Sequence, residues 1–184
     1  LNWDKSPPEI TKESIQNVAK EISGSTVALP YPTFSSRTVQ GKPLHIWTLE
    51  NRLDEITIPT ATTDMYKLTC IDRTVQTAES LTKNSLEKIE TIPTVTEASK
   101  QLGADFRRKD VRASWNEFYA ANPNDTYTIA SFECICSSGT YMRSLAEYIG
   151  KLLDTRALAL AIHRTKIGRY QKLPFNTGFW TKSY

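Results

Sequence analysis

Tyr141 and Arg143 are the two residues of this sequence whose types and spacing best suit chemistry. They stand in the segment Cys136–Gly150, which begins Cys-Ser-Ser-Gly-Thr-Tyr-Met-Arg. Gly139 predicts a tight turn there, because glycine adopts a positive φ at no steric cost. An aromatic ring and a fixed cation two residues apart can contact a nucleobase and an anionic group together. We therefore expect this segment to bind a base beside a phosphate or a carboxylate.

A strand and a helix flank this pair. The segment 126–136 is rich in aromatic and β-branched residues, which is typical of a strand. After the turn, Leu145, Ile149 and Leu152 recur at helical spacing and predict a helix that takes over near Arg143. The pair then falls where a sheet edge meets a helix N-terminus. Backbone N–H groups and the helix dipole favour an anion at such a place.

A second segment mixes aromatic and basic side chains, namely Tyr31, Phe34, Arg37 and Lys42. Within it, Gln40-Gly41-Lys42 predicts a hairpin turn between two short strands over 34–39 and 44–47. Aromatic rings interleaved with cations suit a nucleic acid. Composition leaves a plainer alternative open, an edge hairpin whose cations are only solvated.

The rest of the pattern predicts an α+β fold, with a mixed, mostly antiparallel sheet and helices packed on it. Thr11 is a good N-cap for an amphipathic helix over 12–23. Strands are expected over 56–59 and 65–71. Near the end of the chain we expect a short apolar helix over 155–161 and a final strand over 161–170, where apolar and basic residues alternate.

Residues 74–125 differ from their surroundings. They are polar over 74–96, then predict a helix over 97–122, and end in the turn Asn122-Pro-Asn-Asp125. We interpret this region as an insertion between two sheet strands, partly helical or disordered. The run 107–109, joined by Arg112, is its basic cluster. These cations either lie on a solvated helix face or contact RNA phosphates.

Composition and motifs disfavour several functional classes. With 184 residues, 39% of them apolar, and a net charge of +3, the chain suits one globular domain with an insertion. It has no Gly-rich phosphate loop, nucleophile elbow or HExxH motif. Its three cysteines, Cys70, Cys134 and Cys136, lack metal-ligand spacing, and we expect buried thiols in the 126–136 strand. We expect no cofactor and no metal. With no signal peptide or membrane segment visible, a cytoplasmic location is expected.

Three blocks of the sequence resemble the TruB family of RNA pseudouridine synthases. The block 31–44 is similar to the family's Pro-Pro-x-Tyr-Ser-Ala-x-Lys-x-x-Gly-Lys. The block 136–150 contains Gly-Thr-Tyr-Met-Arg, where the family has Gly-Thr-Tyr-Ile-Arg. The block 162–170 is similar to Leu-Arg-Arg-Thr-x-x-Gly-x-Phe. The resemblance covers most of 4–170 apart from the insertion, and it implies a pseudouridine synthase-like fold.

The resemblance also implies roles for individual residues. Tyr141 would lie against a flipped target uracil, placed for proton transfer, and Arg143 would hold the catalytic aspartate ionised. Ile162 would supply an apolar contact to the base, and base flipping would be obligatory. The substrate implied is the T-loop stem-loop of a tRNA, with no small-molecule cofactor and no membrane. The residues then expected to contact the RNA are Tyr31, Phe34, Arg37, Lys42, Ile162 and Arg164.

One family motif is absent from the sequence. The family's nucleophilic aspartate lies in Gly-x-Leu-Asp-x-x-Ala-x-Gly, and none of the aspartates here has that context. Tyr31, Phe34 and Thr38 also replace the family's Pro, Tyr and Lys. We therefore expect 1–184 to be the C-terminal part of a catalytic domain, inactive alone. Two alternatives remain: a non-catalytic RNA-binding module of the same fold, and an α+β interaction domain in which Arg143 makes only a surface salt bridge.

Overall fold

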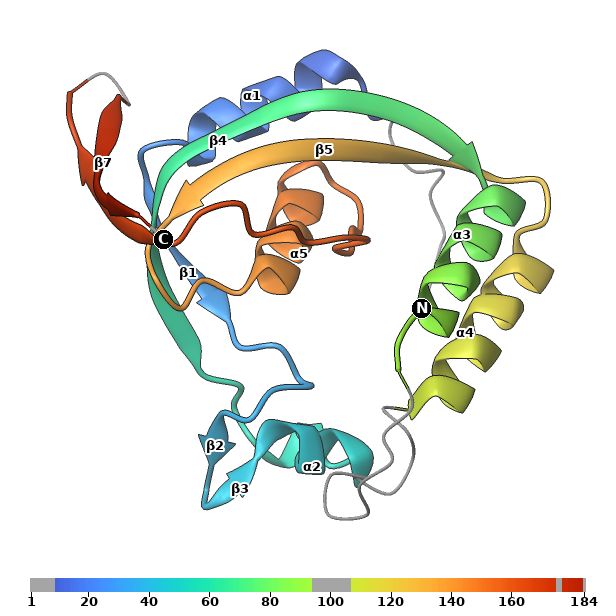
Figure 1. The fold of residues 1–184 in the computed structure, drawn as a ribbon. Coiled ribbons are helices and arrows are strands. Elements are labelled where there is room, and N and C mark those ends of the chain that lie inside the picture. The colour runs from blue at the N-terminus through green and yellow to red at the C-terminus, as the bar shows by residue number, and fades with distance from the viewer. Residues whose placement is uncertain (1–8, 94–106, 175–176, 184) are drawn as a thin grey trace. The chain divides into compact units, whose positions relative to one another are not determined.

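The computed structural model describes residues 9–93, 107–174 and 177–183. The chain divides into two compact units, one of 1–72 with 131–184 and the other of 73–130. Among the described residues, the first unit contains most of the main sheet, three α-helices and a C-terminal hairpin, and the second contains two α-helices (Figure 1). The expected α+β class, with antiparallel strand pairs and packed helices, is confirmed.

The main sheet has the strand order β1-β4-β5. Its strands are β1 (Thr26–Pro30), β4 (Thr60–Thr77) and β5 (Thr126–Cys136). β1 runs antiparallel to β4, with Thr26 opposite Asp64. β4 includes the expected strand over 65–71, but 56–59 precedes it as irregular chain, so that strand prediction is wrong. Pro59 has no N–H for a ladder bond, which fits its place just outside the strand.

Two helices cover the core of the first unit. In α1 (Lys12–Ile22) the Thr11 side chain caps the N-terminus by accepting from the Ser14 N–H at 3.0 Å, as expected. The second helix, α5 (Met142–Leu152), begins just after Tyr141. Its Leu145 and Ile149 share one apolar cluster with residues of α1, β1 and β4. The other members of this cluster are Val18, Ala19, Ile22, Val27, Leu29, Met65 and Leu68.

A small hairpin and a helix follow β1. The hairpin pairs β2 (Thr38–Val39) with β3 (Lys42–Pro43), so the strand expected over 34–39 is shorter than predicted. Its turn residues are Gln40 and Gly41; Gly41 has the positive φ that the sequence predicted, and Gln40 has one as well. The strand expected over 44–47 is wrong, because this segment forms α2 (Leu44–Leu49), followed by the short 3-10 helix η1 (Leu53–Glu55). Leu44 and Trp47, three residues apart, are its buried side chains, and so short an apolar run does not separate helix from strand.

The end of the chain differs most from expectation. Residues 156–167 contain no helix or strand, so the helix predicted over 155–161 is wrong and the final strand starts later than predicted. That strand is β6 (Gly168–Lys172), which pairs with β7 (Gly178–Ser183). Leu158, Ile162 and Ile167 are 65%, 58% and 55% exposed, so the apolar positions that suggested regular structure do not enter a core.

The second unit contains two helices that pack together, α3 (Ala78–Glu90) and α4 (Arg108–Ala121). The polar stretch 74–96 gave no indication of α3. Of the helix predicted over 97–122, the part from Arg108 is confirmed, and residues 94–106 lie outside the described residues. The assignment of 74–125 as an insertion stays a prediction. Within the described part of the chain, no helix is both long and apolar enough to cross a membrane.

Candidate functional site

The turn that leads from β5 into α5 is held by a network of hydroxyl and backbone groups. Ser137 exchanges two hydrogen bonds with Asp64 of β4: its N–H donates to the Asp64 carbonyl at 2.9 Å, and its hydroxyl accepts from the Asp64 N–H at 3.0 Å. The Thr63 hydroxyl contacts the hydroxyls of Ser137 and Thr140. Gly139, with φ +84°, allows the chain to reverse. The network fixes where α5 begins.

Tyr141 stands at the N-cap of α5 and meets the segment that follows β1. Its ring packs edge-on against the ring of Tyr31, with centroids 5.4 Å apart and an interplanar angle of 67°. The Arg37 guanidinium lies 4.9 Å from the Tyr31 ring centroid, a cation–π distance. Three of the residues predicted from two separate sequence blocks are therefore brought together into one aromatic and cationic group.

Arg143, the second residue of the same helix, contacts the same segment. Both of its terminal N–H groups donate to the Phe34 carbonyl oxygen at 3.2 Å, and the side chain is exposed. Beside it, the buried Ser144 hydroxyl donates to the Pro30 carbonyl at 2.5 Å. Among the described residues, no carboxylate forms an ion pair with Arg143. The guanidinium has five N–H donors, so its hydrogen-bonding capacity exceeds what one carbonyl uses.

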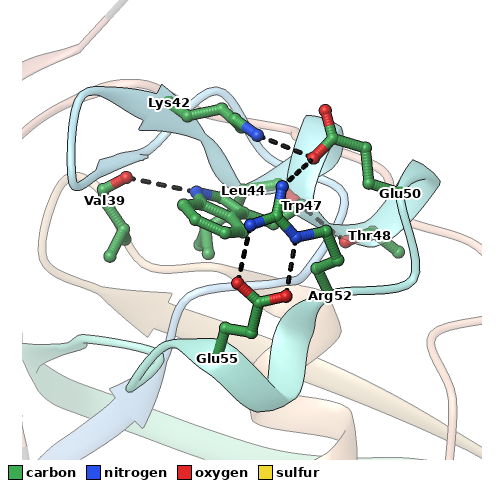
Figure 2. A network of polar contacts seen from close by, with 8 residues as sticks. All are labelled: Val39, Lys42, Leu44, Trp47, Thr48, Glu50, Arg52 and Glu55. Atoms are coloured by element: carbon green, nitrogen blue, oxygen red, sulfur yellow. Dashed lines mark hydrogen bonds and ion pairs between the residues drawn. The ribbon is translucent and has the colours of Figure 1, made fainter.

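Lys42 lies in a different environment, which we call the Trp47 cluster (Lys42, Trp47, Glu50, Arg52 and Glu55; Figure 2). Its ammonium pairs with Glu50 at 2.6 Å and sits 4.4 Å from the Trp47 ring centroid. Arg52 lies 5.2 Å from that centroid and binds Glu55 through two N–H groups, at 2.6 and 2.7 Å. Each cation in the cluster therefore already has a carboxylate partner.

The charges of the Trp47 cluster reinforce one another. The hydrogen bond from Lys42 holds the pKa of Glu50 below its usual range, and the hydrogen bond from Arg52 does the same for the pKa of Glu55. The Trp47 indole N–H donates to the Val39 carbonyl at 3.1 Å, which fixes the ring. Sequence reasoning missed this cluster. The alternation of basic and acidic residues around Trp47 was the signal that could have found it.

Ile162 and Arg164 lie in the irregular segment before β6. Ile162 is 58% exposed, and none of the contacts described for Tyr141 involves it. Arg164 lies close enough to the end of β5 for its charge to lower the pKa of the Cys136 thiol. The roles expected for Tyr31, Phe34, Arg37, Lys42, Tyr141, Arg143, Ile162 and Arg164 stay predictions.

Cys134 and Cys136 share one face of β5, as their spacing predicted, but both are half-buried. A hydrogen bond from Cys134 is the main cause that lowers the pKa of Cys136, helped by the Thr140 hydroxyl and the Arg164 charge, and it raises the pKa of Cys134. A lowered pKa for Cys136 was not expected from the sequence. Among the described residues, no group of three His, Cys, Asp or Glu side chains could hold a metal ion.

Comparison with known proteins gives consistent names. The chain is 27% identical over 164 residues to tRNA pseudouridine synthase B of Listeria welshimeri, a match that covers 89% of this chain and 38% of that protein. It is 31% identical over 74 residues to the protein of the same name from Mycobacterium tuberculosis, covering 40% of this chain and 25% of that protein. No family model matches the chain.

A shorter match has higher identity. Over 39 residues the chain is 49% identical to tRNA pseudouridine synthase B of Nitrosococcus oceani, which covers 21% of this chain and 13% of that protein. In each case the chain spans well under half the length of the curated relative that it matches.

Proposed function

Since this chain is a distant relative of the TruB family of RNA pseudouridine synthases, we propose that it forms part of a uridine pocket in such an enzyme. One observation carries the proposal. The Tyr141 ring packs on Tyr31, and the Arg143 guanidinium binds the Phe34 carbonyl, so two sequence blocks that resemble the family converge on one segment, 31–34. The three relatives described above are all named tRNA pseudouridine synthase B.

The chemistry proposed is a cofactor-free isomerisation. The bond between the ribose C1′ and uracil N1 breaks, the base turns, and uracil C5 bonds to C1′; C5 then loses its proton and N1 gains one. In this reaction an aspartate attacks the nucleoside. The Arg143 guanidinium would keep that carboxylate ionised and oriented, because a fixed cation favours the charged form. The Tyr141 ring would stack against the flipped base, near the proton that leaves.

The substrate proposed is a cytoplasmic tRNA, recognised at its T-loop stem-loop. Tyr31, Tyr141 and Arg37 offer stacking and cation–π contacts to an unstacked base, as sequence-specific RNA sites commonly do. Because the sequence contains no Gly-x-Leu-Asp motif, we propose that this chain alone does not isomerise uridine. The Arg143 guanidinium would then need a carboxylate that no aspartate of residues 1–184 offers in the family's sequence context.

A second function is favoured by the state of Arg143. Its terminal N–H groups already bind a backbone carbonyl, and no described carboxylate pairs with it. The same geometry suits a non-catalytic RNA-binding module that keeps the uridine pocket. The coding sequence just upstream of the Leu1 codon separates the two functions. An in-frame Gly-x-Leu-Asp motif supports the enzyme, and a start codon there supports the module.

The test of RNA recognition uses a fluorescently labelled T-loop stem-loop and the purified chain. We expect Arg143→Ala to weaken binding about tenfold, which corresponds to about 1.4 kcal/mol and lies within the range for a specific contact to a nucleotide. Lys20→Ala is the matched control, since it removes one exposed charge from α1, and we expect less than a twofold change. Equal affinities for Arg143→Ala and the unmodified chain would favour the plain interaction domain.

The test of catalysis measures pseudouridine in the same RNA by carbodiimide labelling and primer extension. The expected result is no pseudouridine after incubation with the purified chain, because the attack on the nucleoside lacks its carboxylate. Pseudouridine formed by the chain alone would contradict the expectation of inactivity while supporting the enzyme.

A further inference from the structure

The positive charge of this chain is concentrated at its end. Residues 155–184 hold six of the 23 basic residues and none of the 20 acidic ones, so the first 154 residues hold 17 basic against 20 acidic. The six cations are Arg156, Arg164, Lys166, Arg169, Lys172 and Lys182. A one-sided distribution of this kind is the electrostatic footprint of a polyanion-binding surface.

The β6–β7 hairpin gives this charge an ordered support. The Tyr170 ring packs between Tyr66 of β4, in a tilted contact, and Trp180 of β7, in an edge-on contact, with centroid distances of 5.4 Å to each. Gly178 lets β7 approach closely, since a Cβ there would come within 2.5 Å of the Tyr170 ring. The Lys172 ammonium donates to the Gly24 carbonyl at 2.9 Å. The hairpin is therefore tied to the main sheet through side-chain contacts.

The register of the hairpin sets two cations against each other. Arg169 stands directly opposite Lys182, so the register places two cations next to each other on the hairpin. None of the ion pairs described for 9–93, 107–174 and 177–183 involves Arg164, Lys166 or Arg169. The cations Lys42 and Arg52 differ, since each is neutralised by a carboxylate. A polyanion bound along the hairpin would meet both cations.

The hairpin also presents aromatic surface beside its cations. Phe179 is 52% exposed, and the Lys166 ammonium lies 5.6 Å from the Trp180 ring centroid. Exposed rings interleaved with cations are typical of surfaces that bind single-stranded nucleic acid, because a base stacks on the ring while the cations meet phosphates. An acidic protein surface would use the cations but not the ring.

The hairpin and the candidate uridine pocket are connected through one strand. Tyr66, which stacks on Tyr170, stands two residues after Asp64, whose backbone holds the turn at Ser137. Two residues along a strand span about 7 Å. We propose that the β6–β7 hairpin is a second RNA-contact surface, which binds an unpaired RNA segment next to the one that enters the uridine pocket. This proposal rests on the proposed function, because it assumes that the substrate is RNA.

The charge contribution is tested with Arg169→Gln/Lys182→Gln in the full chain. The probe is a T-loop stem-loop with a five-nucleotide unpaired 3′ tail, titrated between 50 and 200 mM salt. If two phosphate contacts are lost, the slope of log K against log salt falls by roughly 1.4 to 1.8. The control Lys12→Gln/Lys20→Gln removes two exposed charges from α1, and we expect its slope to match the unmodified chain.

The stacking contribution is tested with Phe179→Ser. We expect binding of the tailed RNA to weaken about tenfold, and binding of the same stem-loop without a tail to change less than twofold. Thermal unfolding followed by circular dichroism checks the fold. We expect the midpoint of Arg169→Gln/Lys182→Gln to change little, because both side chains are exposed, so that weaker binding is not a folding defect.

Two outcomes would overturn the proposal. One is an equal loss of slope in Arg169→Gln/Lys182→Gln and in the α1 control, which would mean that only net charge matters. The other is displacement of the tailed RNA by polyglutamate at the same charge concentration as by unlabelled RNA, which would mean that the surface does not select RNA. Failure of the proposed function would give a different result. In that case Arg143→Ala would bind the untailed stem-loop as tightly as the unmodified chain does.

Discussion

Arg143 binds a neutral acceptor, although its position at the start of α5 would suit an ionised one. Two N–H groups share the Phe34 carbonyl oxygen at 3.2 Å, a contact weaker than a charge-assisted pair with a carboxylate. The side chain is exposed, so water screens its charge. If a carboxylate or phosphate bound at this corner, the Arg143 guanidinium would therefore exchange solvent and one carbonyl for a stronger partner.

Cys136 gives a prediction at the scale of a single thiol. Its neighbours Cys134, Thr140 and Arg164 lower its pKa to about 6, so half of it should be thiolate near that pH. Since the thiolate is the nucleophile, the rate of alkylation by iodoacetamide should rise with pH and level off above about 7. Mass spectrometry of the Cys136 peptide after timed quenching measures this rate.

The matched variant for this thiol is Cys134→Ala, which removes the donor that contributes most. In this variant the pKa of Cys136 should move up toward the ordinary value for cysteine, roughly 8.5, and its alkylation profile should shift with it. Cys70, which is 8% exposed, serves as the internal reference and should react slowly throughout. An unmodified chain whose Cys136 reacts only above pH 8 would contradict the assigned hydrogen bonding.

At the scale of elements, α5 is attached to β1 and to the segment after it through side chains of its first turn. Ser144 is 2% exposed and binds the carbonyl of Pro30, the last residue of β1, while Arg143 binds Phe34. Leu145 and Ile149 bury the other side of the helix in the core. The position of Tyr141 against Tyr31 thus depends on how the helix start is held to the end of the strand.

Ser144→Ala tests this attachment. Removal of the hydroxyl leaves the Pro30 carbonyl without that donor in a buried place, so we expect the free energy of unfolding to fall by about 1–3 kcal/mol. Ser138→Ala is the control, since Ser138 is exposed in the turn, and its change should stay within about 0.5 kcal/mol. Urea unfolding followed by tryptophan fluorescence measures both. Equal stabilities of the two variants would mean that the hydroxyl does not hold the helix.

Gly139→Ala tests the turn before α5. At φ +84° an L-residue is strained, and no atom lies within 4 Å of the added Cβ, so the cost is in the backbone alone, about 1–2 kcal/mol. Gly41→Ala is the matched control, with φ +79° and equally open surroundings. We expect similar losses of stability in urea, but weaker binding of the T-loop stem-loop only for Gly139→Ala. Weaker binding in both variants would mean that stability, not the corner, governs RNA affinity.

At the scale of the whole molecule, the apolar core of the first unit is independent of the second. Every buried residue of the main cluster lies within 18–68 or 145–149. The second unit has its own contacts, including the Arg112–Glu90 ion pair and the ring contacts of Phe118 with Trp115 and Tyr127. The Ala78 N–H donates to the Asp125 carbonyl at 2.9 Å, so the two ends of the helical pair are adjacent.

That adjacency predicts that α3 and α4 can be removed together. A chain in which 79–124 is replaced by a short Gly-Ser turn should keep a cooperative thermal transition, because the core of the first unit is intact and the strands need only a tight connection. It should also keep the dependence of RNA binding on Arg143. Circular dichroism and the anisotropy titration check the two properties. Loss of the transition would contradict the independence of the two cores.

The sequence by itself determined the features that local chemistry controls. The N-cap at Thr11, the turns at Gly41 and Gly139 and the helix that follows Tyr141 each depend on a few neighbouring residues, so pattern and composition were enough. The placement of Cys134 and Cys136 on one face of the strand follows likewise from the two-residue period of a strand. The resemblance to the TruB family rested on short blocks of the same kind.

Tertiary structure decided the features that depend on distant partners. The segment 44–47 became a helix because Leu44 and Trp47 found buried positions on one side, and 156–167 stayed irregular because its apolar residues found none. Whether Lys42 meets RNA or a carboxylate depended on Glu50, and Arg143 found the Phe34 carbonyl 109 residues away in sequence. Contacts between residues so far apart leave no periodic trace in the sequence, so only the folded chain shows them.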